Sequence, residues 1–540
     1  MSKISDYLGK NLSGEVTVES AVRDYFASDG SVLGKKPQVV IYPRTTDDMR
    51  KVTRFAWRLA EKGHNLPLTM RGYGADNTGS ATGAGALLVT PAHLQKILEL
   101  DTKQQKVRVQ PGINLRTLQE ALATHGLFFP IYPTNLKFST IGGAIAGGVT
   151  GVKSLRYGTM RDWVERLEVI LSNGEVIETG RLGRRELNAK KGLQTLEGEI
   201  YREIDALIEE NAELLTQNSD AGLPNNTGYQ LGQVKRPDGS FDLTPLIVGS
   251  QGTLAIVTQA ILSLAPRPVD TALMVATLPS LENFGEMVEA ILAYQPSEFE
   301  YIDGAALEWV EEKAGFSPLG TMVKNRPEGV LIIEFDDGDG GRSKNARKVM
   351  KMLDGLGVGV ELAETWEDKE DIWSVRYSVG ALENHFAGDV QPVQFADAVV
   401  PIGRIDIFLD KLHALIVKRK IKGYISGRIG AGNLGVTALL DLGKIGDRQA
   451  VFGFMRDYHQ LAGKLGGSIA GDSGDGRLRQ AAARGQYDDA MLGIFEKVKN
   501  IFDPKGILNP GVIIGSREAD LIADLNVKRQ PRFLDYRPRV

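Results

Sequence analysis

Residues 71–79 read RGYGADNTG, a glycine-rich loop that directly follows the strand signal LPLTM (66–70). In such a loop, successive backbone N–H groups can form a concavity that binds anions. Its glycines permit left-handed dihedral angles, which Asp76 and Asn77 also tolerate. The glycine spacing and the strand signal after the loop do not fit a Rossmann fingerprint. Taken alone, the segment is either a plain turn or a phosphate-binding loop.

A second glycine-rich segment lies about 60 residues further on, at residues 139–151, STIGGAIAGGVTG. Small residues and glycines allow the backbone to lie against a flat, bulky ligand. The alternative is a tightly packed structural loop. Because one segment suits a phosphate and the other a planar group, the two together favour a nucleotide cofactor.

The composition limits the classes of function. The chain has 540 residues, 64 basic and 68 acidic, and its net charge of −4 gives no general attraction to nucleic acid. It contains no cysteine, which excludes disulfides, thiolate metal ligands and a flavin tethered through sulfur. The length is sufficient for two or more domains, and the composition fits a reducing cytoplasm.

Neither end of the chain predicts insertion into a membrane. The N-terminal segment MSKISDYLGKNLSG is polar and lacks the apolar core of a signal peptide. No apolar run approaches the ~18 residues of a transmembrane helix. We therefore expect a cytoplasmic protein, either free or peripheral at the inner membrane face. The basic tail at 527–540 could touch anionic lipid, although a tail lying over its own domain is favoured.

The order of elements predicts an α+β protein. A capped amphipathic helix is expected at 45–63, and hairpins at 98–112 and 164–180. Pro266 and Pro268 mark a boundary, after which strands and helices predict an antiparallel sheet with helices on one face. The predicted division is 1–268, 269–500 and a C-terminal return segment, 501–540, packing on the first domain.

Several segments resemble one family, the FAD-binding oxidoreductases of the vanillyl-alcohol-oxidase (PCMH) type. The similar branch contains the glycolate oxidase subunit and the D-lactate and D-2-hydroxy acid dehydrogenases. The resemblance implies a PCMH-type FAD-binding domain of two subdomains and a ferredoxin-like substrate or cap domain. The segments that carry it are 24–49, RGYGADNTG, PTNLKFSTIGGAIAGG (133–148), 155–180, GSQGTLAIVTQAILSLAPRP (249–268) and FDPKGILNPG (502–511).

The resemblance also implies which residues meet a noncovalent FAD. The family's pyrophosphate loop corresponds to RGYGADNTG, its flavin-facing loop to PTNLKFSTIGGAIAGG, and an asparagine near the flavin to the C-terminal return. No histidine in the first loop and no cysteine in the chain could tether the flavin. The expected FAD-binding residues are Arg71, Gly72, Tyr73, Gly74, Ala75, Asp76, Asn77, Pro133, Thr140, Gly142, Gly143, Gly147, Gly252, Thr253, Ile256 and Asn509.

On the substrate side, the family needs a cation for the carboxylate of a 2-hydroxy acid. Arg376, in EDIWSVRYSVGALENHF (370–386), matches the helix that supplies such an arginine. An isolated helical arginine is more often solvated or ion-paired, so both roles stay open. His385 falls on the opposite face of the helix from Arg376, which favours a structural role.

The metal-binding motifs of the family are absent. ISGRIGAGNLGV (425–436) resembles a loop whose two histidines help to bind a divalent metal, but Arg428 and Gly435 stand at those positions. GDSGDG (471–476) places Asp472 and Ser473 where relatives carry a metal-binding glutamate and the histidine regarded as base. We therefore expect no metal.

Several roles remain open in these two loops. Arg428 could stabilise a developing alkoxide, or it could pair with Asp472 and fill space. Asp472 or Asp475 could act as a base if burial raises its pKa. Ser473 has no evident partner and is expected to be a poor base. The predicted catalytic residues are Arg376, Arg428 and Asp472.

The expected function is oxidation of a D-lactate- or glycolate-like 2-hydroxy acid by hydride transfer to FAD. Oxygen, a quinone or a partner protein would accept the electrons. One alternative is a flavoprotein of the same fold that oxidises another alcohol or a sugar. Another is a catalytically silent flavoprotein subunit. The protein could form a homodimer or be a subunit of a complex under any of these functions.

Overall fold

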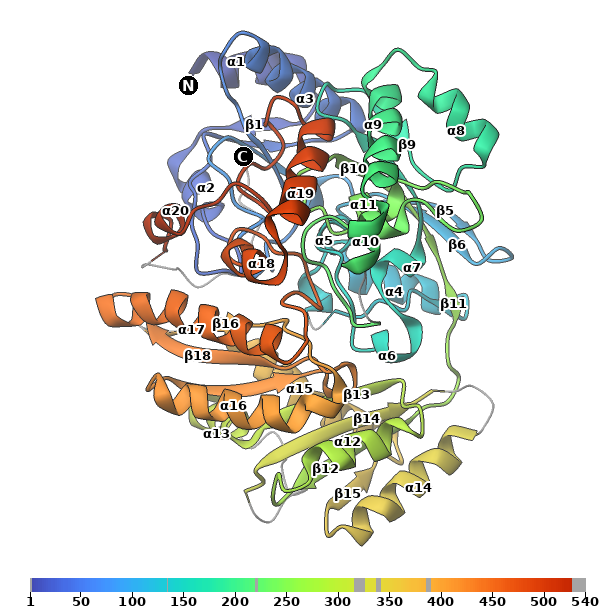
Figure 1. Cartoon of the computed structure of the whole chain (residues 1–540), viewed down its shortest axis with the longest axis vertical. Coiled ribbons are helices and arrows are strands. Elements are labelled where there is room, and N and C mark those ends of the chain that lie inside the picture. Colours follow the sequence, from blue (N-terminus) through green and yellow to red (C-terminus); the bar gives the residue numbers. More distant parts are fainter. Residues whose placement is uncertain are drawn as a thin grey trace.

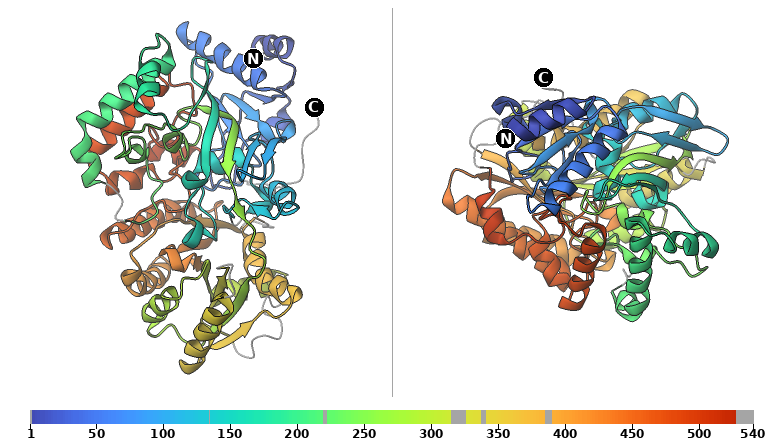
Figure 2. Two further views of the ribbon diagram at one scale, coloured as in Figure 1. Left: turned by 90° about the vertical axis from the view of Figure 1, so that its right-hand side faces the viewer. Right: turned by 90° about the horizontal axis from the view of Figure 1, so that it is seen from above.

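The computed structural model of the chain describes residues 2–133, 135–218, 222–314, 326–336, 341–384 and 390–526. The first two sheets form the upper body in Figure 1, and the third sheet with its helices forms the lower body. The left view of Figure 2 shows the same arrangement. The mixed helices and antiparallel sheets confirm the predicted α+β class. His385 and the basic tail at 527–540 lie outside the described residues.

The first sheet has the order β1-β2-β4-β3, and its last three strands are parallel. The predicted helix is present as α3 (Thr46–Glu61), with the side chain of Thr45 accepting a hydrogen bond from the N–H of Asp48. Its apolar face packs on the sheet through Met49, Val52 and Ala56. The strands are β1 (Glu15–Thr17), β2 (Val39–Tyr42), β3 (Leu68–Arg71) and β4 (Ala86–Val89).

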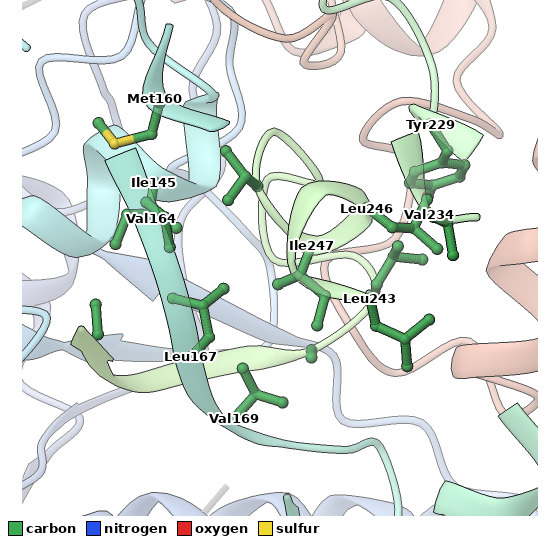
Figure 3. Close-up of a cluster of buried hydrophobic side chains, with 14 of the residues drawn as sticks. Ile145, Met160, Val164, Leu167, Val169, Tyr229, Val234, Leu243, Leu246 and Ile247 are labelled. Carbon is green, nitrogen blue, oxygen red and sulfur yellow. The ribbon is translucent and has the colours of Figure 1, made fainter. Parts of the chain in front are cut away.

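The second sheet is antiparallel, with the order β5-β6-β10-β8-β9. Both predicted hairpins are present, as the pairs β5–β6 and β8–β9. Figure 3 shows side chains of β8 packing against Leu246 and Ile247 of α11 (Thr244–Ile247) and against Leu243, which precedes that helix. The strands are β5 (Ile97–Asp101), β6 (Lys106–Val109), β8 (Val164–Ile170), β9 (Val176–Glu178) and β10 (Ile256–Ser263).

The third sheet is antiparallel with the order β15-β12-β14-β13-β17-β18-β16. Its strands are β12 (Ala272–Leu278), β13 (Glu298–Asp303), β14 (Gly329–Phe335), β15 (Gly359–Leu362), β16 (Val390–Phe395), β17 (Lys422–Gly427) and β18 (Gly435–Asp441).

The expectation that helices cover one face of this sheet is wrong. One face packs against α12 (Phe284–Leu292), α14 (Gly341–Gly355), α16 (Ile405–Lys418) and α17 (Ile445–Lys464). The other packs against α13 (Gly304–Ala314) and α15 (Trp366–Asn384). Successive residues of β12 are buried in different clusters: Leu273 lies in the cluster with α13 and α15, and Met274 in the cluster on the opposite face. Both faces of the strand are therefore apolar, as in strands buried on two sides.

The C-terminal part returns to the upper body. The N–H of Leu68 in β3 donates to the carbonyl of Ile507 over 2.8 Å, and the N–H of Asn509 donates to the carbonyl of Leu68 over 2.9 Å. The preceding helix, α19 (Asp489–Phe502), already shares the core of the second sheet through Phe495 and Val498. Among the described helices, none combines the length and hydrophobicity needed to cross a bilayer.

Candidate flavin and substrate site

One cavity brings both glycine-rich segments together, although they are far apart in the sequence. It is also lined by a turn before β10 and by residues that follow β16 and α17 in the chain. The predicted FAD-binding residues in its lining are Arg71, Gly72, Tyr73, Gly74, Ala75, Asp76, Asn77, Pro133, Thr140, Gly142, Gly143, Gly147 and Gly252.

Two charged side chains shape the first loop from within. The guanidinium of Arg71 is buried and its Nη1 donates to the carbonyls of Ser28 and Ala81 over 2.9 and 3.0 Å. The carboxylate of Asp76 accepts from the N–H groups of Thr78 and Ser80 over 3.1 and 2.8 Å. Burial raises the pKa of Asp76. These side chains fold the loop so that its backbone faces the cavity, an arrangement suited to anions.

Glycine serves two purposes in the cavity wall. A Cβ atom on Gly72 would lie 2.5 Å from Oγ1 of Thr140, and one on Gly142 would lie 2.6 Å from Cβ of Pro111. Gly72 therefore lets the two segments pack closely, and Gly142 lets the second segment pack against Pro111. Gly252, by contrast, has φ +71° and no heavy atom within 4 Å of an added Cβ, so it leaves open space. The segment at 139–151 is therefore both closely packed and part of the cavity wall.

Three of the expected FAD-binding residues lie outside the cavity lining. Thr253 is buried, with its hydroxyl within 2.8 Å of the hydroxyl of Tyr229. Ile256 packs in the core of the first sheet. The Nδ2 of Asn509 donates to the carbonyls of Ser80 and Gln251 over 2.9 and 2.8 Å. Asn509 therefore ties two cavity loops together.

The sequence analysis missed several residues that line the cavity. Gln251 links three segments: its Nε2 donates to Oγ1 of Thr78 over 3.0 Å, and its Oε1 accepts from the N–H of Gly476 over 2.7 Å. Its position next to Gly252 could have indicated this role. The missed lining residues also include Asn135, Phe138, Ser139, Val149, Ser250, Ala255, Val257 and Asp397.

At the loop that resembles a lost metal site, Arg428 pairs with Asp472. Nη2 of Arg428 lies 3.2 Å from Oδ1 of Asp472, and Thr150 bridges them by accepting from Nη1 of Arg428 and donating to the same carboxylate oxygen. Arg428 is 8% exposed and does not line the cavity, whereas Asp472 does. Two roles were left open for Arg428: stabilising an alkoxide or pairing with Asp472. The structure shows the ion pair with Asp472.

Burial raises the pKa of Asp472, the positive charge of Arg428 opposes this shift, and the nearby Asp397 adds to it. Burial also raises the pKa of Asp475 to about 6. Asp475 accepts from the N–H of Gly228 over 2.8 Å and lies outside the cavity lining. Of the two candidate bases, only Asp472 meets the cavity. Among the described residues, no three His, Cys, Asp or Glu side chains are grouped to hold a metal.

The expectation that Ser473 lacks a positioned partner is wrong. Its hydroxyl donates to Oδ2 of Asp397 over 2.8 Å, and Nη2 of Arg479 lies 2.7 Å from the same carboxylate oxygen. Asp397 has φ +82°, a left-handed conformation that is uncommon for residues other than glycine. Such conformations concentrate at functional sites. Asp397, Asp472 and Ser473 all line the cavity, and together they form a polar group in its wall.

Arg376 lies in a different environment, outside the cavity lining. It forms a buried ion pair with Glu300 of β13. Glu298 is completely buried beside this pair, and burial together with the charges of Glu300 and Glu334 raises its pKa well above the usual range. The structure therefore places Arg376 in a buried acidic cluster of the third sheet, apart from Asp472 and Arg428.

We predict that Arg376→Met lowers the free energy of unfolding by about 3 kcal/mol, because it leaves the carboxylate of Glu300 buried without its cation. The double variant R376M/E300Q should recover most of this loss. The control is Arg326→Met, since Arg326 pairs with Glu308 at the surface over 2.9 Å and should contribute less than about 1 kcal/mol. Urea unfolding of the three variants measures the effect. A stable R376M with a raised KM would instead support substrate binding by Arg376.

Comparison with known proteins identifies two family models in the chain. Residues 37–180 match the FAD binding domain, and residues 267–513 match the C-terminal domain of FAD linked oxidases. Two solved structures share the fold. The 4-ethylphenol oxidase of Gulosibacter chungangensis is 16% identical, with a TM-score of 0.67, over 96% of this chain and 98% of that one. p-Cresol methylhydroxylase is 12% identical, with a TM-score of 0.69, over 95% and 96%.

Curated proteins with similar sequences include three kinds of hydroxy acid enzyme. The glycolate oxidase subunit GlcD of Bacillus subtilis is 28% identical over 485 residues, which are 88% of each protein. The D-lactate dehydrogenase of Archaeoglobus fulgidus is 27% identical over 88% of this chain and 91% of that protein. The D-2-hydroxyglutarate dehydrogenase of Pantoea ananatis is 27% identical over 93% of this chain, but the chain spans about half of its length.

Proposed function

We propose, from the premise that the chain belongs to the FAD-linked oxidoreductases with a PCMH-type FAD-binding domain, that it oxidises the CH–OH group of a 2-hydroxy acid to a carbonyl. The observation that carries this proposal is the position of Asp472. Its buried carboxylate, with a raised pKa, lines the same cavity as the two glycine-rich segments. A proton acceptor and the proposed cofactor pocket therefore share one cavity.

The residues of the cavity fit FAD. The backbone of Gly72 to Asn77 is suited to the pyrophosphate, and the small residues at Gly143, Gly147 and Gly252 leave room for a flat ring. When bound, FAD supplies the acceptor for the hydride that leaves the substrate carbon. The absence of cysteine from the chain and of histidine from the first loop supports noncovalent binding.

In the proposed reaction, the carboxylate of Asp472 takes the proton of the substrate hydroxyl. General base catalysis of this kind contributes about 10²- to 10⁴-fold to the rate. Arg428 and Thr150 hold Asp472 through the ion pair and the bridging hydroxyl. Ser473, held by Asp397, offers a second oxygen in the wall of the same cavity. In this proposal Arg428 is a positioning residue.

A neutral alcohol or polyol is the second candidate substrate, and a specific observation favours it. Arg376, Arg428 and Arg479 each pair with a carboxylate, and none of them lines the cavity. A 2-hydroxy acid would have to displace one of these carboxylates to use any of these three cations, and Arg71, which does line the cavity, already donates to the carbonyls of Ser28 and Ala81. A neutral substrate could instead use Asp397, Asp472 and Ser473 as hydrogen-bond partners.

Anaerobic titration of the purified protein tests the proposal by following the visible flavin spectrum. The substrates to compare are D-lactate, glycolate, D-2-hydroxyglutarate and a set of sugars and polyols, with metal content measured on the same sample. Bleaching by a hydroxy acid supports the first candidate, and bleaching only by sugars or polyols supports the second. A flavin that dithionite reduces while every substrate leaves it oxidised would contradict both and favour a silent subunit.

A further inference from the structure

A second cavity of about 550 Å³ lies apart from the flavin site, between α17, α18 (Gln480–Gln486) and α20 (Glu518–Ala523). Its walls include the apolar side chains of Phe452, Met455, Leu478 and Leu521. Its volume lies within the range of about 300–1,000 Å³ that is typical of small-molecule sites. An apolar cavity of this size can accept a ring system.

A buried polar side chain in the wall of this second cavity is that of His459. Its side chain is only 4% exposed, and neither ring nitrogen has a hydrogen-bond partner among the residues that the structure describes. Burial, and secondly the charge of Arg479, lowers the pKa of His459 to about 3. The imidazole is therefore neutral near pH 7, with one N–H donor and one nitrogen acceptor. A buried polar group left unpaired is costly, so this histidine points to a ligand.

A small hollow of about 20 Å³ lies between the second cavity and the flavin cavity. It shares Met455 and Leu478 with the second cavity and Asn77 with the flavin cavity. Nδ2 of Asn77 donates to Oε1 of Gln394 over 2.8 Å at the flavin end of this hollow. The three spaces therefore follow one another, separated by a few side chains.

We propose that the second cavity binds an uncharged quinone, with His459 as its hydrogen-bond partner. A neutral imidazole can donate to a quinone carbonyl and accept from a quinol hydroxyl, so it suits both redox forms. The apolar walls suit the ring, and the charged lining residues Arg456, Lys464 and Glu518 are all exposed, so an uncharged head group fits beside the buried His459. The exposed Arg456 and Lys464 lie at the rim.

The role of this quinone as electron acceptor rests on the proposed function. Hydroxy acid and quinone would give oxo acid and quinol, so that two electrons and two protons pass from the donor to the quinone. Binding of the quinone does not depend on that reaction. It can therefore be tested on the oxidised holoenzyme without any substrate.

Equilibrium dialysis with menadione (2-methyl-1,4-naphthoquinone) tests the site. We expect saturable binding to the wild type, about tenfold weaker binding to His459→Leu, and recovery in His459→Gln, which keeps a donor and an acceptor. His459→Leu should also raise the melting temperature, because it removes an unpaired buried polar group. The melting measurement verifies that the variant is folded.

Filling the cavity provides a second, independent test. Gly485 of α18 lines the cavity, and an added Cβ there would have no heavy atom within 4 Å. Gly485→Leu should therefore abolish menadione binding. Gly446→Leu is the matched control, since Gly446 is also helical with equally open surroundings but lies outside the cavity lining.

Two results would overturn the proposal: no menadione binding to the wild type, or binding that both His459→Leu and Gly485→Leu leave unchanged. The second result would place the quinone elsewhere, for example in the flavin cavity. Failure of every hydroxy acid or alcohol to reduce the flavin would contradict the proposed function alone. The two failures are therefore distinguishable.

Discussion

Gly74→Val is expected to yield a folded protein that has lost its FAD. Gly74 has φ +78°, and a Cβ atom there would overlap the guanidinium of Arg71. Arg71 is fully buried and held by Ser28 and Ala81, so it has little room to move. A β-branched residue is also strained at positive φ. The loop must therefore change its backbone path where it lines the cavity.

The ratio of flavin absorbance to protein absorbance after purification measures this effect. Gly63→Val is the matched control, because Gly63 has φ +79° but no heavy atom within 4 Å of an added Cβ. It introduces the same backbone strain after α3 without the overlap, and should retain FAD. A flavin-replete Gly74→Val would contradict the assignment of this loop to the pyrophosphate.

The two glycine-rich segments could indicate a nucleotide cofactor because they reflect local backbone requirements, whereas the list of residues expected to meet FAD follows from the family resemblance. Glycines in two segments, one of them after a strand, are visible without knowledge of the fold, and the matched FAD binding domain confirms the cofactor. Thirteen of the sixteen residues expected to meet FAD line one cavity. Thr253 and Ile256 belong to a lining segment but are not in the lining, since neighbours in sequence need not face the same side, and no residue of the C-terminal segment around Asn509 lines the cavity.

The substrate end could be predicted less well because it depends on pairing between distant residues. The sequence left both substrate binding and ion pairing open for Arg376, because its partner Glu300 lies on a strand 76 positions earlier. Nothing in the apolar run FADAVV (395–400) indicates a functional role for Asp397. Only the fold brings its carboxylate to Ser473 and Arg479. Such charge pairs need the three-dimensional structure.

The covering of both faces of the third sheet by helices was also not predicted, although the strands themselves carried a signal for it. Strand β14 is buried along its whole length and β12 at every residue except the half-buried Thr277, and neither alternates polar and apolar residues. Such runs indicate burial on both faces. The helices in sequence order do not reveal which face each one covers, because that depends on the crossover of the chain between strands.

Asp472→Asn is expected to slow reduction of the flavin by substrate about 10³-fold while leaving FAD bound. The amide can still accept the hydrogen bond of Thr150, so the local packing is kept, but it cannot take a proton. Because the pKa of Asp472 is raised by burial, the wild-type rate should fall as the pH decreases through that raised value. Asp472→Asn should lose this acidic limb of the pH profile.

Single-turnover bleaching of the flavin under anaerobic conditions measures the step directly, with the substrate found by titration. Asp475→Asn is the matched control, since Asp475 is also buried with a raised pKa but lies outside the cavity lining. Its amide can still accept from the N–H of Gly228, so the rate should stay near that of the wild type. If Asp475→Asn greatly lowered the rate of flavin reduction and Asp472→Asn did not, Asp475 would be the base instead of Asp472. Both carboxylates belong to the same GDSGDG segment.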